Sequence, residues 1–191
     1  MSFLNFFGNR KKGFFEPALG LYRAAVAAAR APEFYARFGV PDTPDGRFDM
    51  IAIHVFLALR RLRQEQGPAR DAAREIAQEL TDLLVADMDR NLREMGVGDL
   101  SVGKQVKALA AAFRGRVAAY DAALDRPDDA GALAEALGRN VFRQAGRAPE
   151  GGINRIAEHI RTVAAALTGQ PWPSIAAGTI VFPPLSDAPK E

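Results

Sequence analysis

Cysteine is absent from the 191 residues of this chain. Without a thiol, the protein has no disulfide bond, no thioether-linked haem, no thiolate metal site and no cysteine nucleophile. A chain without disulfides suits a reducing compartment. Long apolar runs are lacking too, because the alanine-rich residues 24–29 lie between Arg23 and Arg30. No segment approaches the roughly 20 apolar residues of a membrane span.

An excess of charge of either sign is also missing. The 25 basic and 23 acidic residues leave a formal net charge of +2. Because they are interspersed along most of the chain, we expect no sequence-specific contact with nucleic acid. The 48% hydrophobic and 25% charged residues are typical of a soluble globular protein, and the length suffices for one domain with a sizeable core.

Catalytic motifs are missing as well. The sequence has no HExxH, Walker or GxSxG motif and no GxGxxG after a strand. His54 and His159 each border an apolar helical stripe, which is typical of packed side chains. Joint ligation of a haem is the alternative, but nothing in the sequence requires their two helices to meet. We therefore expect a binding protein that is not an enzyme and has no cofactor and no metal site.

Apolar residues at three- and four-residue steps are the main pattern that the chain does contain. They predict two amphipathic helices around residues 82–120, joined at 96–101 as an antiparallel hairpin or a sharp corner. Gly96 suits a left-handed helix end, and Asp99 or Ser101 suits the cap of the next helix. The two stripes consist of Ile76, Leu80, Leu83, Leu84, Met88, Leu92 and Met95, and of Val102, Val106, Leu109, Phe113, Val117, Tyr120 and Leu124.

The same periodicity predicts an all-α fold, a single-domain bundle of about six to seven helices with an extended C-terminal tail. Turn residues make 39–49 a loop. The only strand-like piece, at 180–182, is expected to lie extended over the bundle. We divide the chain into an N-terminal segment (1–15), a helical domain (16–170) and a proline-rich tail (171–191). The other helices are expected over residues 17–30, 32–38, 48–66 and 153–167, and the first central helix over 69–95. The second central helix is expected to end near Asp125, and the helix after it to begin at Asp128 or Asp129.

The first fifteen residues combine aromatic rings with positive charge. Such rings rest in the interface of an anionic membrane, while the cations lie among the headgroups. The alternative is a tail whose aromatic residues dock on the protein's own core, or a partly disordered end. Because no signal-peptide pattern is present, we expect a cytoplasmic protein, peripheral on the inner face of the cytoplasmic membrane. The expected membrane contacts are Phe3, Phe6, Phe7, Arg10, Lys11 and Lys12.

Asp87 is an acidic residue beside the apolar stripe of the first central helix. A carboxylate on a buried face needs a partner. Arg90 and Arg93 lie within reach along the same helix, and Lys104 lies on the next one. Two interpretations stay open: a structural ion pair that holds the joint between the helices, or a recognition surface for another molecule.

Two long blocks carry a resemblance to a known family. They are RAPEFYARFGVPDTPDGRFDMIAIH (30–54) and DLLVADMDRNLREMGVGDLSVGKQVKALAAAFRGRVAAYDAAL (82–124). Both resemble the ubiquinol-cytochrome c chaperone family, strongly over residues 22–120 and loosely elsewhere. The resemblance implies a helical chaperone that binds newly made cytochrome b as its client. It also implies a role in assembly of the ubiquinol-cytochrome c reductase (bc1) complex of the respiratory chain.

Mitochondrial members of that family work with a small partner subunit and near the ribosomal exit. The resemblance therefore implies a small partner subunit or the ribosome as a partner of this chain. The chain lacks the long N-terminal extension of the mitochondrial members, which favours a bacterial cytoplasm. A second hypothesis is a peripheral lipid- or quinone-binding protein, which requires a closed apolar cavity rather than an open groove. A third is an enzyme whose perturbed titratable groups converge in a cleft.

We expect the client to be bound at the joint between the two central helices, together with the 41–49 loop. A structural role stays open for each residue, with Gly96 and Asp99 as helix caps and Arg93 and Glu94 as solvated charges. The expected client contacts are Asp42, Asp45, Arg47, Asp87, Arg93, Glu94, Gly96, Asp99 and Lys104.

Overall fold

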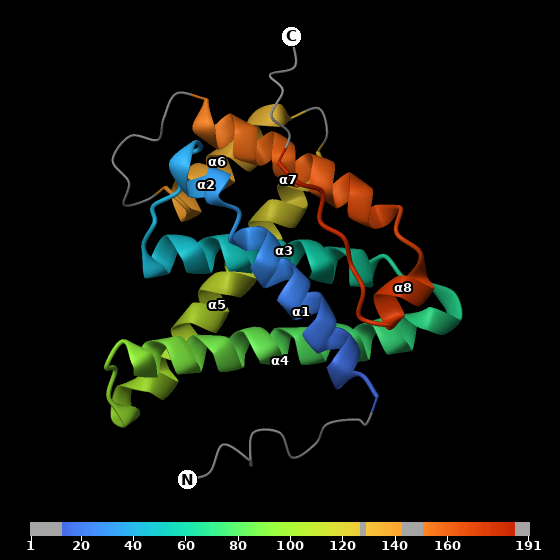
Figure 1. The fold of residues 1–191 in the computed structure, drawn as a ribbon, viewed down its shortest axis with the longest axis horizontal. Helices are drawn as coiled ribbons and strands as arrows, with labels where there is room; N and C mark the ends of the chain where they lie inside the picture. The colour runs from blue at the N-terminus through green and yellow to red at the C-terminus, as the bar shows by residue number, and fades with distance from the viewer. Residues whose placement is uncertain (1–12, 127–128, 143–150, 186–191) are drawn as a thin grey trace.

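The computed structural model in Figure 1 describes residues 13–126, 129–142 and 151–185. These ranges contain helices and no β-strand, which confirms the all-α prediction. None of the helices in these ranges is both long and apolar enough to cross a membrane. The expected membrane contacts, Phe3, Phe6, Phe7, Arg10, Lys11 and Lys12, lie outside the described residues.

Six helices of 11 to 26 residues carry the described fold, and two further helices have only five residues each, in agreement with the predicted bundle. In chain order they are α1 (Phe15–Ala29), α2 (Pro32–Ala36), α3 (Pro44–Arg63), α4 (Arg70–Glu94), α5 (Asp99–Leu124), α6 (Ala130–Asn140), α7 (Gly152–Thr168) and α8 (Trp172–Ala176), with a 3-10 turn, η2 (Gly67–Ala69), before α4.

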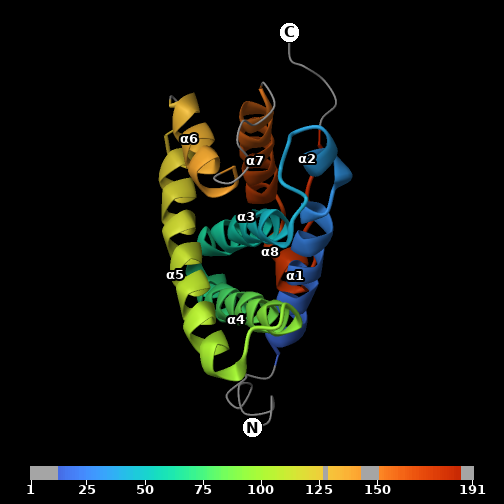
Figure 2. The same ribbon diagram turned by 90° about the vertical axis from the view of Figure 1, so that its left-hand side faces the viewer.

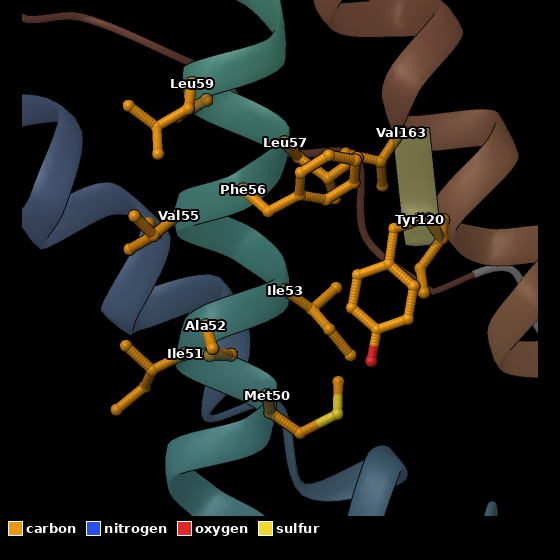
Figure 3. Packing of buried hydrophobic residues seen from close by; sticks show 14 of the residues in the cluster. Met50, Ile51, Ala52, Ile53, Val55, Phe56, Leu57, Leu59, Tyr120 and Val163 are labelled. Atoms are coloured by element: carbon orange, nitrogen blue, oxygen red, sulfur yellow. The ribbon is translucent and has the colours of Figure 1, made fainter. Parts of the chain in front are cut away.

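The central element is α3, which is covered on every side. Residues 50–59 are all buried, as expected for a helix that is apolar all round. α1, α4 and α7 pack along it, and Figure 2 shows α3 and α4 lying between α5 on one side and α1 on the other. In Figure 3, Tyr120 of α5 lies beside Phe56, with ring centroids 5.7 Å apart. Other elements therefore take their positions from α3.

α3 begins earlier than its apolar pattern indicates. It starts at Pro44, because the Thr43 hydroxyl accepts a hydrogen bond from the Gly46 N–H (3.2 Å) and proline suits a first turn. The predicted start at Phe48 was therefore wrong, and the expected loop 39–49 includes the first turns of α3. These turns are polar, so periodicity alone does not mark them.

Close backbone contacts at two glycines join segments that are separate in the chain. A Cβ atom on Gly46 would overlap the carbonyl oxygen of Pro41, and one on Gly20 would overlap that of Gly178. Glycine therefore lets the segment before α3 lie against its first turn, and lets the chain after α8 lie against α1.

The C-terminal tail contains α8, which the sequence did not predict, followed by an extended segment. We call residues 179–185 the C-terminal strap. Ile180 is buried, Val181 is exposed and Phe182 is half-buried, so alternate side chains point toward the bundle. The strand-like piece thus lies extended over the bundle, as expected, but it pairs with no strand in the described chain. In Figure 1 the strap runs from α8 past α1 to α7.

Candidate functional site

The joint between α4 and α5 is a sharp corner built on Gly96. Its φ of 84° is left-handed, and its N–H donates to the Arg93 carbonyl (3.0 Å) while the Val97 N–H donates to the Leu92 carbonyl (3.0 Å). These two bonds end α4 and confirm Gly96 as its C-terminal glycine. The N-cap prediction was wrong, because Gly98 occupies that position without a side-chain bond.

Charged side chains cross this corner. Arg93 donates to Asp89 (2.6 Å) on its own helix and pairs with Asp99, the first residue of α5. These hydrogen bonds raise the pKa of Arg93. Glu94 lies 3.9 Å from Arg90. Because the pairs are exposed, they contribute little to stability and leave charge available at the surface.

Asp87 has a partner that the sequence did not indicate. The Tyr22 hydroxyl of α1 donates to Asp87 Oδ2 (2.7 Å), and Arg90 pairs with Oδ1. Burial, followed by the hydrogen bond to this carboxylate, raises the pKa of Tyr22, so the phenol stays protonated and donates. Arg90 was one of the expected partners. Arg93 pairs elsewhere and Lys104 lies exposed on α5, so Asp87 ties α4 to α1 rather than to α5.

The sequence missed the most buried ion pair in the described chain, Asp49 with Arg116. The side chain of Asp49 is 3% exposed and that of Arg116 is 12% exposed. The pair joins α3 to α5 near the place where α3 begins. Asp49 was assigned to the 39–49 loop, and no local pattern indicates that it turns inward.

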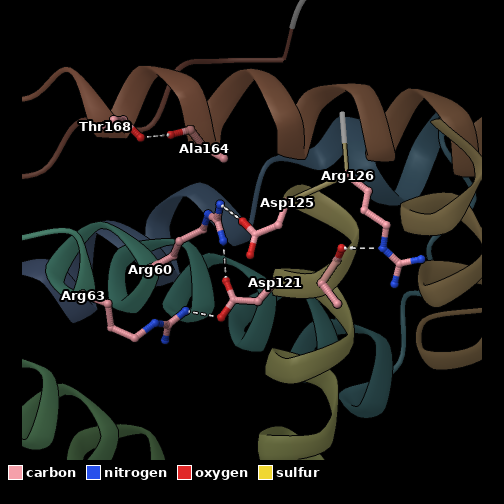
Figure 4. A network of polar contacts seen from close by, with 8 residues as sticks. Arg60, Arg63, Asp121, Asp125, Arg126, Ala164 and Thr168 are labelled. Atoms are coloured by element: carbon pink, nitrogen blue, oxygen red, sulfur yellow. Dashed lines mark hydrogen bonds and ion pairs between the residues drawn. The ribbon is translucent and has the colours of Figure 1, made fainter. Parts of the chain in front are cut away.

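A second network joins the C-terminal end of α3 to the C-terminal end of α5 (Figure 4). Arg60 donates to Asp121 (2.7 Å) and to Asp125 (2.6 Å), and Arg63 donates to Asp121 (2.5 Å). These arginines follow the apolar part of α3, where their sequence indicates only a basic face. The two networks tie both ends of α3 to the C-terminal part of α5, although α5 buries few side chains itself.

The 41–49 loop holds a second group of expected contacts. Arg47 donates to Asp42 (2.7 Å), and this hydrogen bond lowers the pKa of Asp42. Asp45 is exposed in the first turn of α3. Asp42 and Arg47 line a cleft of about 530 Å³ whose other walls are Arg30, Pro32, Tyr35 and Ala36. Three of these six lining residues are charged, unlike the apolar cavity that a lipid or quinone carrier requires.

The expected contacts therefore form two patches rather than one. Asp42 and Arg47 pair within the loop, whereas Arg93, Asp89 and Asp99 pair within the corner. Both patches lie at the end of the molecule where α3 begins and α4 ends, which faces the viewer in Figure 2. The structure thus brings these charges to one end without bonding the two patches to each other.

The two histidines lie close together, His54 buried and His159 half-buried, a meeting of their helices that nothing in the sequence required. Their ring centroids are 6.5 Å apart, and Phe34 of α2 lies 5.6 Å from His54 and 5.5 Å from His159. His54 Nδ1 lies 2.8 Å from the Met50 carbonyl oxygen. Burial lowers the pKa of His54 to about 4 and also lowers that of His159. No group of three or more His, Cys, Asp or Glu side chains suited to a metal occurs in the described residues.

The fold and these surfaces define an all-α protein built around one buried helix, with charged patches at one end and an extended strap over another face. The sequence model of the family described as "Ubiquinol-cytochrome C chaperone" matches residues 36–182. The chain therefore belongs to the ubiquinol-cytochrome c chaperone family, which confirms the resemblance seen in the sequence.

Individual proteins of known name are similar to this chain. It is 30% identical over 127 residues to ubiquinol-cytochrome c reductase complex assembly factor 1 of Mus musculus, covering 66% of this chain and 41% of the mouse protein. The Xenopus laevis protein of that name is 24% identical over 127 residues, 66% of this chain and 60% of its own length. The match thus spans about half the length of these relatives.

A solved structure is similar over nearly the whole chain. The crystal structure of the Cbp3 homolog from Brucella abortus has 39% sequence identity and a TM-score of 0.80, and the match covers 98% of this chain and all of that one. This agreement extends the likeness to the ends of the described fold.

Proposed function

We propose that this protein is a non-catalytic assembly chaperone of the ubiquinol-cytochrome c reductase (bc1) complex. The observation that carries the proposal is its membership of the ubiquinol-cytochrome c chaperone family over residues 36–182. It is supported by the names of the mouse and frog relatives, which are assembly factors of that complex. The helical fold suits such a role, because a bundle can hold an apolar segment of another protein in a groove.

The client in this proposal is newly made cytochrome b. The two charged patches would contact its polar segments, with the corner residues and the 41–49 loop on the same end of the molecule. We place the protein at the inner face of the cytoplasmic membrane, where such a client is inserted. The membrane contacts in this proposal are Phe3, Phe6, Phe7, Arg10, Lys11 and Lys12. A ribosome or a small partner subunit is a further proposed partner.

Deletion of the gene tests the role in assembly. We expect the deletion strain to lose assembled bc1 complex, measured by native gel electrophoresis and by ubiquinol-dependent reduction of cytochrome c, and the loss to be restored by the wild-type chain. A normal amount of active complex without the protein would refute the role.

Affinity purification tests the client. Tagged protein from a lysate that contains native membranes should enrich cytochrome b without the mature complex, as measured by mass spectrometry. Enrichment of a lipid or quinone with no polypeptide would instead favour a small-molecule carrier.

Charge reversal tests the corner. Lys104→Glu should reduce recovery of cytochrome b several-fold without loss of helical circular dichroism, because Lys104 is exposed. The matched control is Lys107→Glu, another exposed lysine three residues further along α5 that lies outside the proposed contact. Equal recovery with both variants, or loss of helicity in Lys104→Glu, would remove Lys104 from the client surface.

A further inference from the structure

The C-terminal strap packs against side chains of other elements, and we call the surface that it covers the groove. Its Phe182 ring lies 5.4 Å from the His54 ring of α3, which in turn contacts Phe34 of α2. Ile180 is 6% exposed and belongs to the apolar core cluster. Figure 1 shows the strap between α1 and α7 and in front of α3. The groove therefore has an aromatic floor and takes alternate side chains of an extended chain.

One side chain holds the backbone of the strap. Gln170, just after α7, donates from Nε2 to the Val181 carbonyl (2.6 Å) and accepts at Oε1 from the Val181 N–H (2.9 Å). The buried Arg61 donates to the Gln170 carbonyl (2.8 Å) and so positions it. A primary amide that binds both polar groups of one residue acts as a neighbouring β-strand would. It recognises extended backbone whatever side chain that residue carries.

The strap can leave the groove without the unfolding of any helix. The strap belongs to no helix or sheet in the described chain, and beyond Thr179 the two-bond clamp of Gln170 ties its backbone to the bundle. Pro183 and Pro184 have no backbone N–H, so their release leaves no donor unpaired. The apolar side chains of Ile180, Phe182 and Leu185 add contacts with the core.

We propose that this groove is a binding site for an extended apolar polypeptide segment, and that the strap is its resident occupant, which an incoming client segment displaces. The inference rests on the proposed function, which supplies the client. The corner carries paired charges and the cleft has three charged residues among the six that line it, which suits polar segments. An apolar segment requires an apolar groove, and the strap itself shows which chemistry this groove accepts: extended backbone with apolar side chains at alternate positions.

The test is binding of a labelled peptide with the sequence of residues 179–185, TIVFPPL, to full-length protein. Phe182→Ala weakens the resident strap, so fluorescence polarisation should show the peptide binding about tenfold or more tightly than to wild type. The matched control is Val181→Ala in the same strap, because the Val181 side chain is 64% exposed. It should bind the peptide as weakly as wild type. Adding Gln170→Ala to Phe182→Ala should abolish the gain, since the peptide needs the same clamp.

Equal peptide affinity for wild type and Phe182→Ala, or an equal gain in Val181→Ala, would overturn the inference. If Phe182→Ala does not fold, hydrogen exchange on the wild type gives the answer: excess peptide should speed exchange of the Val181 amide, and an unchanged rate would overturn the proposal. Failure of the proposed function looks different. In that case the peptide exchanges with the strap, but deletion of the gene leaves the bc1 complex at its normal level.

Discussion

At the scale of single residues, the ion pairs of this protein are either buried or exposed, and burial decides how much each pair contributes to the free energy of unfolding. Asp49 and Arg116 are almost fully covered, so removing one partner leaves the other charge without compensation in a poorly solvated place. We expect Asp49→Ala to lower the free energy of unfolding by about 3 kcal/mol, measured by urea denaturation at pH 7.

The matched control for this prediction is the exposed pair at the corner. Asp99 is 88% exposed, so Asp99→Ala should leave the urea midpoint unchanged because water solvates Arg93 in its place. A similar effect of both substitutions would mean that burial does not distinguish the two pairs.

His54 gives the stability of the protein a dependence on pH. Burial lowers its pKa from 6.5 to about 4 in the folded chain, so between these values the unfolded chain binds a proton that the folded chain does not. The stabilisation is fully present above about pH 6.5. It is lost toward pH 4 by about 1.4 kcal/mol per pH unit, and His159 acts in the same direction.

Urea unfolding at pH 7.5 and pH 5.5 measures this loss. His54→Asn keeps a donor near the Met50 carbonyl but cannot titrate, so its loss of stability between the two pH values should be smaller than that of the wild type. An equal loss in both proteins would assign the pH dependence to other groups.

At the scale of elements, helices with an apolar stripe and a glycine or proline boundary could be predicted from the sequence. The end of α4 at Gly96 and the cap of α6 at Asp129, whose side chain accepts from the Ala132 N–H (3.0 Å), are confirmed. The start of α3 at Pro44 and the helix α8 could not be predicted in this way. The first has a polar turn, and the second has only five residues.

Only the contacts of the charged site that are local in the sequence could be predicted. Periodicity places Asp87 beside a buried face, and Arg90 lies within reach on the same helix. The other partner of Asp87, Tyr22, is 65 residues away in the chain, so only the packing of α1 across α4 brings it there. The same holds for Asp49 and Arg116, which are 67 residues apart. Local patterns do not record such distant contacts.

Two glycine-to-alanine substitutions test the packing of elements against each other. Gly46→Ala places a methyl group on the Pro41 carbonyl, so it should destabilise the protein by about 1–3 kcal/mol and disturb the cleft beside the loop. Gly103→Ala in α5 meets nothing within 4 Å and should stabilise by about 0.5–1 kcal/mol through helix propensity. Thermal unfolding followed by circular dichroism measures both, and the same sign for both would contradict the close contact at Gly46.

At the scale of the whole molecule, the described fold is separate from the proposed membrane contact. α1 begins at Phe15, and Phe14 packs against the core. Removal of residues 2–12 should therefore leave helical circular dichroism unchanged while reducing flotation with vesicles that contain anionic lipid.

Two variants separate the parts of this contact. Replacing Arg10, Lys11 and Lys12 by alanine should remove the salt-sensitive part of flotation, and replacing Phe3, Phe6 and Phe7 by alanine should remove the rest. Flotation of the truncated chain equal to that of the full chain would move the membrane contact away from this segment.

The contact between Gly20 and Gly178 joins two segments that the ribosome makes at different times. A ribosome adds roughly 5–20 residues per second, so the first turns of α1 are complete about 10–30 seconds before the backbone that covers them has been made. During synthesis α1, α3 and α7 therefore all exist before the strap does. Every new molecule therefore passes once through a stage in which the residues that border the strap have been polymerised and residues 179–185 have not.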